Sequence, residues 1–459
     1  MTVPSADLAN LRGLLDVVVH ALAAGSAERG GPAPSTTPEE LAASWLDLEN
    51  VPDEGLGADA LADIVRRYAA GSVDPADPAC VAHLQPPPLP IAVAADVAIS
   101  ALNQSLDSWD QAPAGTSLEP PVIRSLAALV GYDPGVAGGV VTTGGTESML
   151  MGLLLARDRG TDGRRARVLC SAAAHFSVAR NAGFLGLGED SVVVVPTGAD
   201  HRMDAAGLRA ALATVEAGGE RPVAVVATAG TTDLGAIDPL REVAAAAREH
   251  GAWLHADAAY GGGALFSRAL APLLDGIALA DSVGLDLHKV GWLPAASGVF
   301  LVRDDAAFAP LARSVAYLNA ADDEEAGYPS LLGHSLRTTR RADVVRIAVV
   351  LRALGRDGLG ARVDRCHALA AYAADRVQAH DDLELYADPV LTTVVFRLRG
   401  GDLVNAQVRR ALLASGRAVV GRTEIGGAVW LKLTLLNPST AESDVDAVLD
   451  AVREAGRSS

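Results

Sequence analysis

Lys289 is the residue of this chain whose chemistry is easiest to name. It lies in the apolar run 281–302 and is the only lysine before Lys432, although the 459 residues include 38 lysines and arginines. Arginine keeps its proton near neutral pH, whereas the amine of a lysine in an apolar setting can act as a nucleophile. Such an amine condenses with an aldehyde cofactor such as pyridoxal phosphate. A surface lysine at a strand end is the structural alternative.

Two further stretches carry groups that this chemistry needs. Asp257 follows the apolar run 252–256, so it lies where a parallel strand is expected to end, and open α/β sheets bind ligands there. A carboxylate in that position can pair with a protonated pyridine nitrogen. Residues 144–146, Gly-Gly-Thr, open a predicted helix whose free N–H groups suit a phosphate. Taken singly, a strand-end cap and a simple turn explain these features equally well.

The order of these motifs, phosphate turn, strand-end Asp and then His-Lys, resembles the group II decarboxylases that use pyridoxal phosphate. That family includes the aromatic amino acid, glutamate and diaminobutyrate decarboxylases. The resemblance runs from about Pro78 to about Val448 and includes three more segments, 174–183, 228–238 and 335–341. It implies the α/β architecture of fold type I of the pyridoxal-phosphate-dependent transferases. That architecture has a large domain with a mostly parallel seven-stranded sheet, a smaller C-terminal α/β domain and an N-terminal helical segment.

The same resemblance implies a division of the chain and an oligomeric state. Residues 1–80 would be the helical segment that packs on the partner of a homodimer, 81–345 the large cofactor-binding domain and 346–459 the small domain. The active site would lie at the subunit interface. A helical hairpin that packs on its own chain is the alternative for the first segment.

The resemblance assigns four catalytic residues. Lys289 would hold the cofactor aldehyde and Asp257 its ring nitrogen, while His175 would stack on the outer face of the ring and touch the departing carboxylate. The acidic stretch 317–332, marked by Gly and Pro, is predicted to form a mobile lid, with Tyr328 as the proton donor. The structural alternatives are a satisfied core histidine and a solvated loop with an incidental tyrosine.

The remaining cofactor-binding residues implied by the resemblance surround these four. Gly145, Thr146 and His288 would lie on the phosphate side. Thr228 would contact the cofactor or the substrate carboxylate, and Ala259 would pack beneath the ring. Together with His175, Asp257 and Lys289 they form the predicted cofactor site, and no metal is expected.

The activity implied is the decarboxylation of an L-amino acid to an amine and carbon dioxide. Segments 101–111, 317–319 and 431–438 look most like the diaminobutyrate branch, which includes siderophore-pathway lysine decarboxylases. A diamino acid such as 2,4-diaminobutyrate, lysine or ornithine is therefore the expected substrate. Acidic residues could attract its side-chain ammonium, unless they only form a solvated face. These residues are Asp107, Asp110, Asp322, Asp323, Glu324 and Glu325.

Departures from that branch keep other reactions open. Met149, Trp292 and Leu293 stand where diamine-type relatives tend to have other residues, and we expect them to make the pocket more apolar. A substrate with an apolar or modified side chain, a decarboxylation that continues to oxidative deamination, and an aminotransferase or lyase reaction therefore remain alternatives. The turn at 143–146 lacks the Gly-x-Gly-x-x-Gly spacing of nicotinamide-binding proteins.

Composition limits the partners and the compartment. Half of the residues are apolar and a fifth are charged, as in a globular protein, and the net charge of −18 argues against nucleic acid or an anionic membrane surface as partner. Cys80, Cys170 and Cys366 are too few for a disulfide framework and lack zinc-like spacing. No signal-like start and no long uncharged apolar run are present. We therefore expect a cytoplasmic protein.

Hydrophobic patterns predict the elements that position these residues. Apolar runs of strand length alternate with helical patterns, which favours a parallel sheet wrapped by helices, and a smaller α/β unit follows. An amphipathic helix is expected over 7–24 and another helix over 39–48. The strands predicted in chain order are 167–170, 191–195, 223–228, 252–256, 297–302, 383–386, 393–398 and 430–435. Further helices are expected from about 92, over 118–132 and 343–354, and over 403–415 and 441–454.

Overall fold

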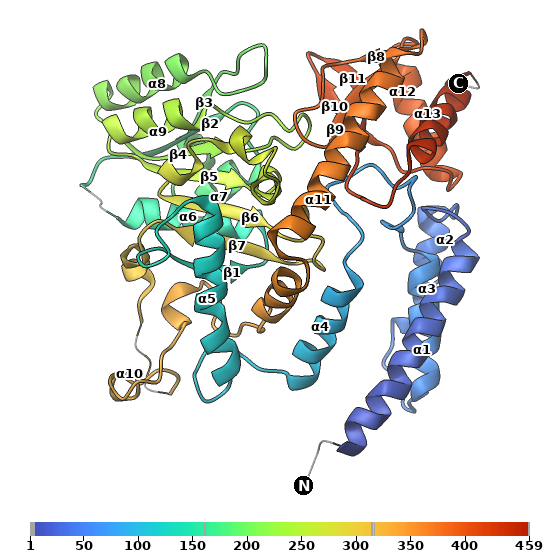
Figure 1. Ribbon diagram of the computed structural model, residues 1–459, viewed down its shortest axis with the longest axis horizontal. Coiled ribbons are helices and arrows are strands. Elements are labelled where there is room, and N and C mark those ends of the chain that lie inside the picture. The colour runs from blue at the N-terminus through green and yellow to red at the C-terminus, as the bar shows by residue number, and fades with distance from the viewer. Residues whose placement is uncertain (1–4, 160–161, 314, 316, 458–459) are drawn as a thin grey trace. The chain divides into compact units, whose positions relative to one another are not determined.

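The computed structural model of the protein describes residues 5–159, 162–313, 315 and 317–457. Its chain forms two compact units, coloured along the sequence in Figure 1. The larger unit comprises 84–367 and 390–392, and the smaller comprises 1–83, 368–389 and 393–459. The three-part division expected from the sequence, with boundaries at 80 and 345, stays a prediction.

The larger unit is built on a seven-stranded sheet in the order β1-β7-β6-β5-β4-β2-β3. Strand β7 is antiparallel to both β1 and β6, and all other neighbours are parallel. Six strands therefore point their carboxyl ends toward one edge, which confirms the predicted mostly parallel sheet. The strands are β1 (Gly138–Thr142), β2 (Ala166–Ser171), β3 (Val192–Val195), β4 (Arg221–Thr228), β5 (Trp253–Ala258), β6 (Ser282–Asp286) and β7 (Gly298–Val302).

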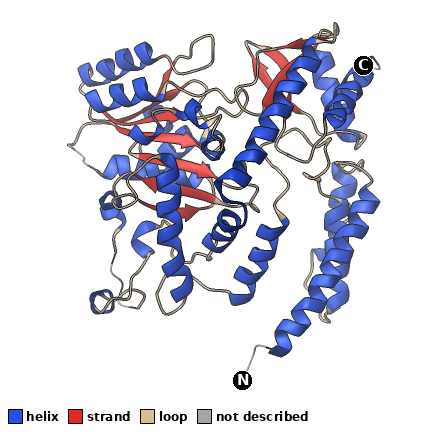
Figure 2. Cartoon of the chain, in the orientation of Figure 1, coloured by secondary structure: helices blue, strands red, loops and turns tan. Residues whose placement is uncertain are grey.

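Helices cover this sheet, with strands drawn in red and helices in blue in Figure 2. Helix α6 packs across the middle strands, while α8 and α9 pack on β2 to β5. Because both faces are covered, every residue of β6 and β7 is buried, and such strands are continuous apolar runs. The helices are α4 (Pro90–Leu102), α5 (Pro113–Val130), α6 (Gly145–Asp158), α7 (Ser177–Phe184), α8 (Ala205–Ala217), α9 (Leu240–Glu249), α10 (Ala321–Glu325) and α11 (Val344–Gln378), which Gly355 interrupts.

Five strands of this sheet lie within two residues of their predicted bounds. Strands β1 and β6 were not predicted, because Gly138, Gly139, Gly284 and Asp286 dilute their apolar patterns. Helix α5 begins at Pro113, not at the predicted 118, and it includes two internal prolines.

The smaller unit contains an antiparallel sheet in the order β10-β11-β9-β8 with helices packed on it. Its apolar core joins this sheet to α12, α13 and the end of α11. Strand β10 was missed because its exposed positions are polar and break the apolar run. The elements are β8 (Leu383–Leu385), β9 (Thr393–Leu398), α12 (Asp402–Ala414), β10 (Gly421–Ile425), β11 (Ala428–Thr434) and α13 (Glu442–Arg457).

The same unit includes an N-terminal hairpin of α1 (Ser5–Arg29) and α3 (Ala58–Ala70), with α2 (Pro38–Ala43) between them. A side chain at Gly25 would collide with the α3 backbone, so glycine permits this close packing. The predicted apolar stripe was partly wrong, because Leu8 and Leu22 are 59% and 44% exposed. By length and composition alone, 8–29 is also apolar enough to cross a membrane.

Candidate active site

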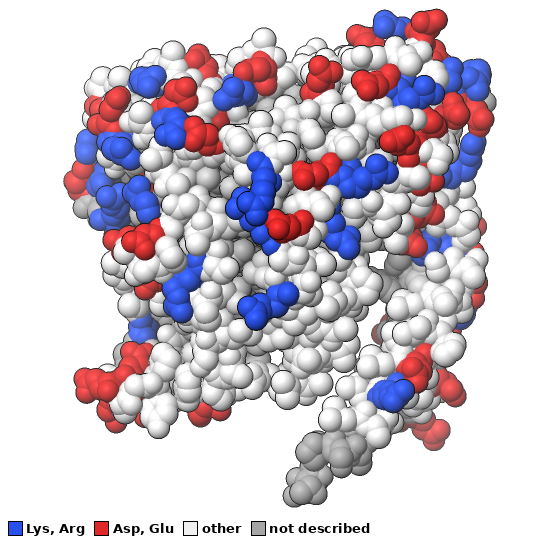
Figure 3. All heavy atoms as spheres, viewed as in Figure 1, with Lys and Arg blue, Asp and Glu red and all other residues white. Residues whose placement is uncertain are grey.

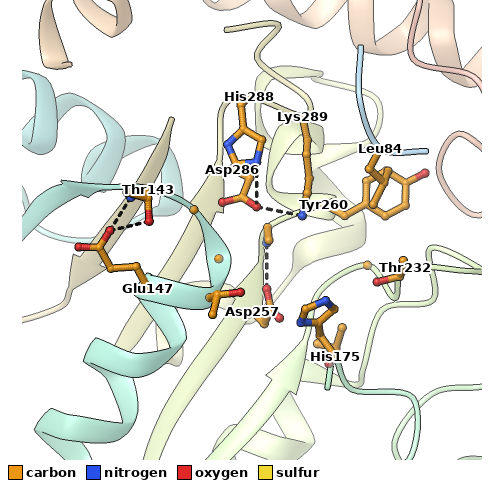
Figure 4. A pocket seen from close by; sticks show the side chains of 16 residues that line it. Leu84, Thr143, Glu147, His175, Thr232, Asp257, Tyr260, Asp286, His288 and Lys289 are labelled. Carbon is orange, nitrogen blue, oxygen red and sulfur yellow. Dashed lines mark hydrogen bonds and ion pairs between the residues drawn. The ribbon is translucent and has the colours of Figure 1, made fainter. Parts of the chain in front are cut away.

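A cavity of about 290 Å³ lies in the larger unit at the carboxyl ends of the strands. Its wall takes residues from the segments after β1 and β2, from the ends of β4, β5 and β6, and from the turn after β6 (Figure 4). All the residues predicted to bind the cofactor line it. They are Gly145, Thr146, His175, Thr228, Asp257, Ala259, His288 and Lys289.

Lys289 is held by a carboxylate that the sequence reasoning missed. Its Nζ lies 2.9 Å from Oδ2 of Asp286, the last residue of β6, whose side chain is only 3% exposed. His288 Nε2 lies 3.6 Å from the same oxygen. In Figure 4 Lys289 extends toward Asp286, with Asp257 and His175 below it in the view. The structure thus places the predicted amine and the predicted ring-nitrogen partner on one cavity.

The Gly-Gly turn lies where β1 ends and α6 begins. Gly144 has a φ of 148°, a conformation that side chains disfavour, and a side-chain carbon added there would lie only 3.1 Å from Cε1 of His288. Glu147 Oε2 accepts a hydrogen bond from the backbone N–H of Thr143 at 2.6 Å, and Arg337 Nε donates to Glu147 Oε1 at 3.0 Å. Arg337 therefore ties the segment 335–341 to the turn, a contact that the sequence did not reveal.

Thr228 and Asp257 are direct neighbours across β4 and β5. Buried Asp238 accepts the Thr228 backbone N–H at 2.7 Å, and its burial raises its pKa. Thr228 Oγ1 is buried on the cavity wall and has no hydrogen-bond partner among the described residues. Asp257 accepts the backbone N–H of Ala259 at 3.1 Å, so one carboxylate oxygen is fixed by its own turn.

His175 stands in the short segment between β2 and α7. Its Nδ1 lies 2.8 Å from the Ser177 hydroxyl, which fixes the orientation of the ring. Burial lowers the pKa of His175, and the nearby Asp257 carboxylate opposes that effect. The imidazole is therefore mainly neutral at neutral pH.

Tyr328 does not line the cavity of Lys289. It is half exposed and lines a second cavity of about 230 Å³ with Trp109, Asp110 and Asp323, and its ring centroid lies 6.2 Å from that of Trp109. The acidic residues of α10 form the red group at the lower left of Figure 3. These lid residues and the Lys289 cavity are thus separate sites within one chain.

Three residues expected to make the pocket more apolar do not reach it. Met149, Trp292 and Leu293 are buried in the core, and none of them is among the sixteen residues that line the cavity. That prediction was wrong, because their side chains are buried away from the cavity. Asp107 is also buried and lines neither cavity.

Known proteins match this chain along most of its length. Residues 38–399 match the pyridoxal-dependent decarboxylase conserved domain. The chain belongs to the pyridoxal-dependent decarboxylase family. It is 44% identical over 452 residues to L-2,4-diaminobutyrate decarboxylase of Rhizobium meliloti. The aligned region covers 96% of this chain and 90% of that protein. It is 38% identical over 429 residues to the protein of the same name from Acinetobacter baumannii, with 87% and 84% covered.

Solved structures of decarboxylases have the same fold as this chain. A decarboxylase domain from Vibrio parahaemolyticus, named for diaminobutyrate-pyruvate transaminase and L-2,4-diaminobutyrate decarboxylase, superimposes with a TM-score of 0.88 at 31% identity, covering 100% of this chain and 98% of that chain. Oryza sativa TDC, solved with PLP and tryptamine, gives 0.91 at 26% identity, with 100% and 99% covered. These findings confirm the resemblance and the fold class read from the sequence.

This decarboxylase uses pyridoxal phosphate and removes the carboxylate of an amino acid as carbon dioxide. The cavity fits that cofactor. It offers an amine for the aldehyde, a helix start bounded by glycines for the phosphate, and a carboxylate for the ring nitrogen. Among the described residues, no ion pair joins Asp257 to a cation, whereas Glu147 and Asp286 are each paired. A protonated ring nitrogen would supply the missing charge.

Proposed function

We propose that this decarboxylase acts on L-2,4-diaminobutyrate and releases carbon dioxide and 1,3-diaminopropane. The observation that carries the proposal is the name shared by the relatives at 44% and 38% identity. The acidic residues of the lid segment and of the second cavity support it, since they suit a substrate with a side-chain ammonium. The apolar-substrate alternative has lost the pocket residues on which it depended.

Each residue of the cavity would have its own role in the reaction. Pyridoxal phosphate, when bound, supplies an electron-withdrawing ring that takes up the electrons of the broken bond. Lys289 would hold the cofactor until the substrate amine replaces it, and Asp257 would keep the ring nitrogen protonated. Neutral His175 would lie on the open face of the ring and turn the substrate carboxylate out of the ring plane. Thr228 Oγ1, which lacks a partner among the described residues, would donate to the cofactor or to that carboxylate.

Tyr328 would supply the last proton, to the substrate Cα. In one chain it lines the second cavity and not that of Lys289, so this role requires the lid to move or to reach the neighbouring subunit. Tyr328 lies three residues after the end of α10, and the residues from Ala321 to Tyr328 are all exposed, which is compatible with such movement.

We propose a cytoplasmic homodimer in which residues 1–80 pack on the partner. Helices α1 and α3 bury only their shared side and leave large apolar residues in solvent, a pattern that marks an interaction surface. A second protein copy explains these residues better than a membrane, because Arg12 and Asp16 interrupt α1. The exposed apolar residues are Leu8, Val19, Leu22, Ile64 and Tyr68.

The test is product analysis over a matched series of substrates. Purified protein is given 2,4-diaminobutyrate, ornithine, lysine and glutamate, and carbon dioxide and amine are measured together. The proposal expects the highest kcat/KM with diaminobutyrate and equal amounts of both products. A keto acid in place of carbon dioxide would indicate an aminotransferase, and an aldehyde would indicate oxidative deamination. Light scattering of the purified protein tests the dimer.

A further inference from the structure

Asp286 lies between the amine and the phosphate turn. Its Oδ2 binds Lys289 Nζ at 2.9 Å, and its Oδ1 is buried without a hydrogen-bond partner among the described residues. A side-chain carbon added to Gly144 would lie 3.6 Å from Oδ1, and one added to Gly145 would lie 3.4 Å from Oδ2. The unpartnered oxygen therefore borders the turn at the start of α6, where the phosphate is expected.

A carboxylate is an unusual neighbour for a phosphate, because two negative groups repel each other at short range in a poorly solvated site. The other charged groups at the cavity do not relieve that repulsion. Glu147 is paired with Arg337, and Asp257 and His175 lie below Asp286 in the view of Figure 4. Lys289 and His288 are the cationic or titratable groups within 4 Å of the Asp286 carboxylate.

We propose that Asp286 makes the reactivity of Lys289 depend on the phosphate of the incoming cofactor. Without phosphate, the ion pair holds the amine as an ammonium, which is not a nucleophile. Asp286, and not Lys289, is among the nearest neighbours of the turn, so a phosphate there would destabilise the carboxylate more than it stabilises the ammonium, and the proton would pass from Lys289 Nζ to Asp286 Oδ2. The protonated Asp286 carboxyl would then donate a hydrogen bond to the phosphate, which the ionised carboxylate would repel.

The neutral amine of Lys289 can then react with the aldehyde of the cofactor. Its nitrogen forms a bond to the aldehyde carbon, and the aldehyde oxygen leaves as water with the two amine hydrogens. Asp286 thereby discriminates against aldehydes that lack a phosphate, beyond any difference in their affinity. This inference rests on the proposed role of Lys289 as the residue that holds the cofactor.

The experiment uses the full chain freed of cofactor by dialysis with hydroxylamine. Pyridoxal, which lacks the phosphate, is added with inorganic phosphate or with sodium chloride at equal ionic strength. The rate of attachment is followed by visible absorbance, and the product is trapped with borohydride and located by peptide mass spectrometry. Because Lys432 is the other lysine of the chain, the label can be assigned without ambiguity.

In the native protein, inorganic phosphate should speed attachment to Lys289 by about tenfold, equivalent to about 1.4 kcal/mol. Asp286→Asn should attach pyridoxal quickly in chloride and gain nothing from phosphate. The matched control, Asp275→Asn, removes an exposed carboxylate that does not line the cavity and should behave as the native protein does.

Two results would overturn the inference: a native rate that phosphate does not change, or an equal acceleration in Asp286→Asn. The comparison of phosphate with chloride uses only the native protein, so it remains valid even if Asp286→Asn folds poorly. Circular dichroism would reveal such a folding defect. A label on Lys432 alone would instead refute the role of Lys289, and with it the proposed function. The two failures are therefore distinguishable.

Discussion

The buried ion pair between Glu119 and Arg340 supports the strand that leads to the phosphate turn. Arg340 Nη1 donates to the two Glu119 carboxylate oxygens at 2.7 and 2.5 Å, and each side chain is 2% exposed. Glu119 Oε1 also accepts the backbone N–H of Val141, near the end of β1, at 3.3 Å. We expect Glu119→Leu to leave the Arg340 charge and this N–H buried without partners.

The size of the effect follows from that burial. Removing one partner of a buried ion pair costs about 3–5 kcal/mol, whereas replacing both partners with apolar residues is often neutral. An unfolding entropy of about 2.1 cal/mol/K per residue converts this loss to a fall in Tm of roughly 3–5 °C if the whole chain unfolds together. The double variant Glu119→Leu, Arg340→Met should lose less stability than the single variant, because only the Val141 N–H remains unpaired, at about 1–3 kcal/mol.

Scanning calorimetry with saturating pyridoxal phosphate measures these differences, since a constant excess of ligand keeps its contribution to stability comparable. Cofactor fluorescence provides a second reading, because a loosened β1 should weaken cofactor binding in the single variant. A single variant that loses less than about 1 °C, or a double variant that loses as much as the single, would show that the pair does not hold this region.

Three further predictions concern the site and its pH dependence. Asp257→Asn should lower kcat by at least about 100-fold with the cofactor still attached, since a neutral amide cannot keep the ring nitrogen protonated; absorbance and turnover measured together check this. Tyr328→Phe should lower kcat by about 10²–10⁴-fold with little change in KM if it donates the proton, whereas Tyr317→Phe, on the same segment, should not, and equal effects would remove the role. Burial lowers the pKa of His255 to about 4. As the pH falls, His255 is protonated near pH 6.5 in the unfolded chain but only near pH 4 in the folded one. The free energy of unfolding is therefore highest above about pH 6.5 and falls by about 3 kcal/mol toward pH 4. Denaturant midpoints should show a smaller loss in His255→Gln.

The resemblance carried by the motifs predicted the mostly parallel sheet and eight of the residues that line the cavity. Parallel strands bring their carboxyl ends to one edge, so residues that follow separate apolar runs, such as Thr228, Asp257 and Lys289, meet there whatever the loops between them. The same reasoning fails for β1 and β6, whose glycines hide the strand pattern although their ends carry the turn and Asp286.

The partners of the charged residues could not be predicted. Glu119 and Arg340 lie 221 positions apart, and Glu147 and Arg337 lie 190 apart, so only the folded chain brings them together. Asp286 lies three residues before Lys289, but in the sequence it resembles any acidic residue at the end of a strand. Its role depends on the direction of its two oxygens, one toward the amine and one without a partner. Side-chain direction of that kind follows from tertiary packing.

The pairing of charges also explains why the cavity needs its cofactor. Of the carboxylates on its wall, Glu147 pairs with Arg337 and Asp286 pairs with Lys289. Among the described residues, Asp257 accepts the backbone N–H of Ala259 and forms no ion pair with a cation. Once Lys289 gives up its charge to hold the aldehyde, Asp286 also loses its cation. Pyridoxal phosphate would pair its protonated ring nitrogen with Asp257. Its phosphate would accept a hydrogen bond from Asp286, provided that Asp286 has taken up the proton of Lys289. The proposed proton transfer and the fit of the cofactor are therefore one electrostatic requirement, and substituting Asp286 should disturb cofactor capture before it disturbs the fold.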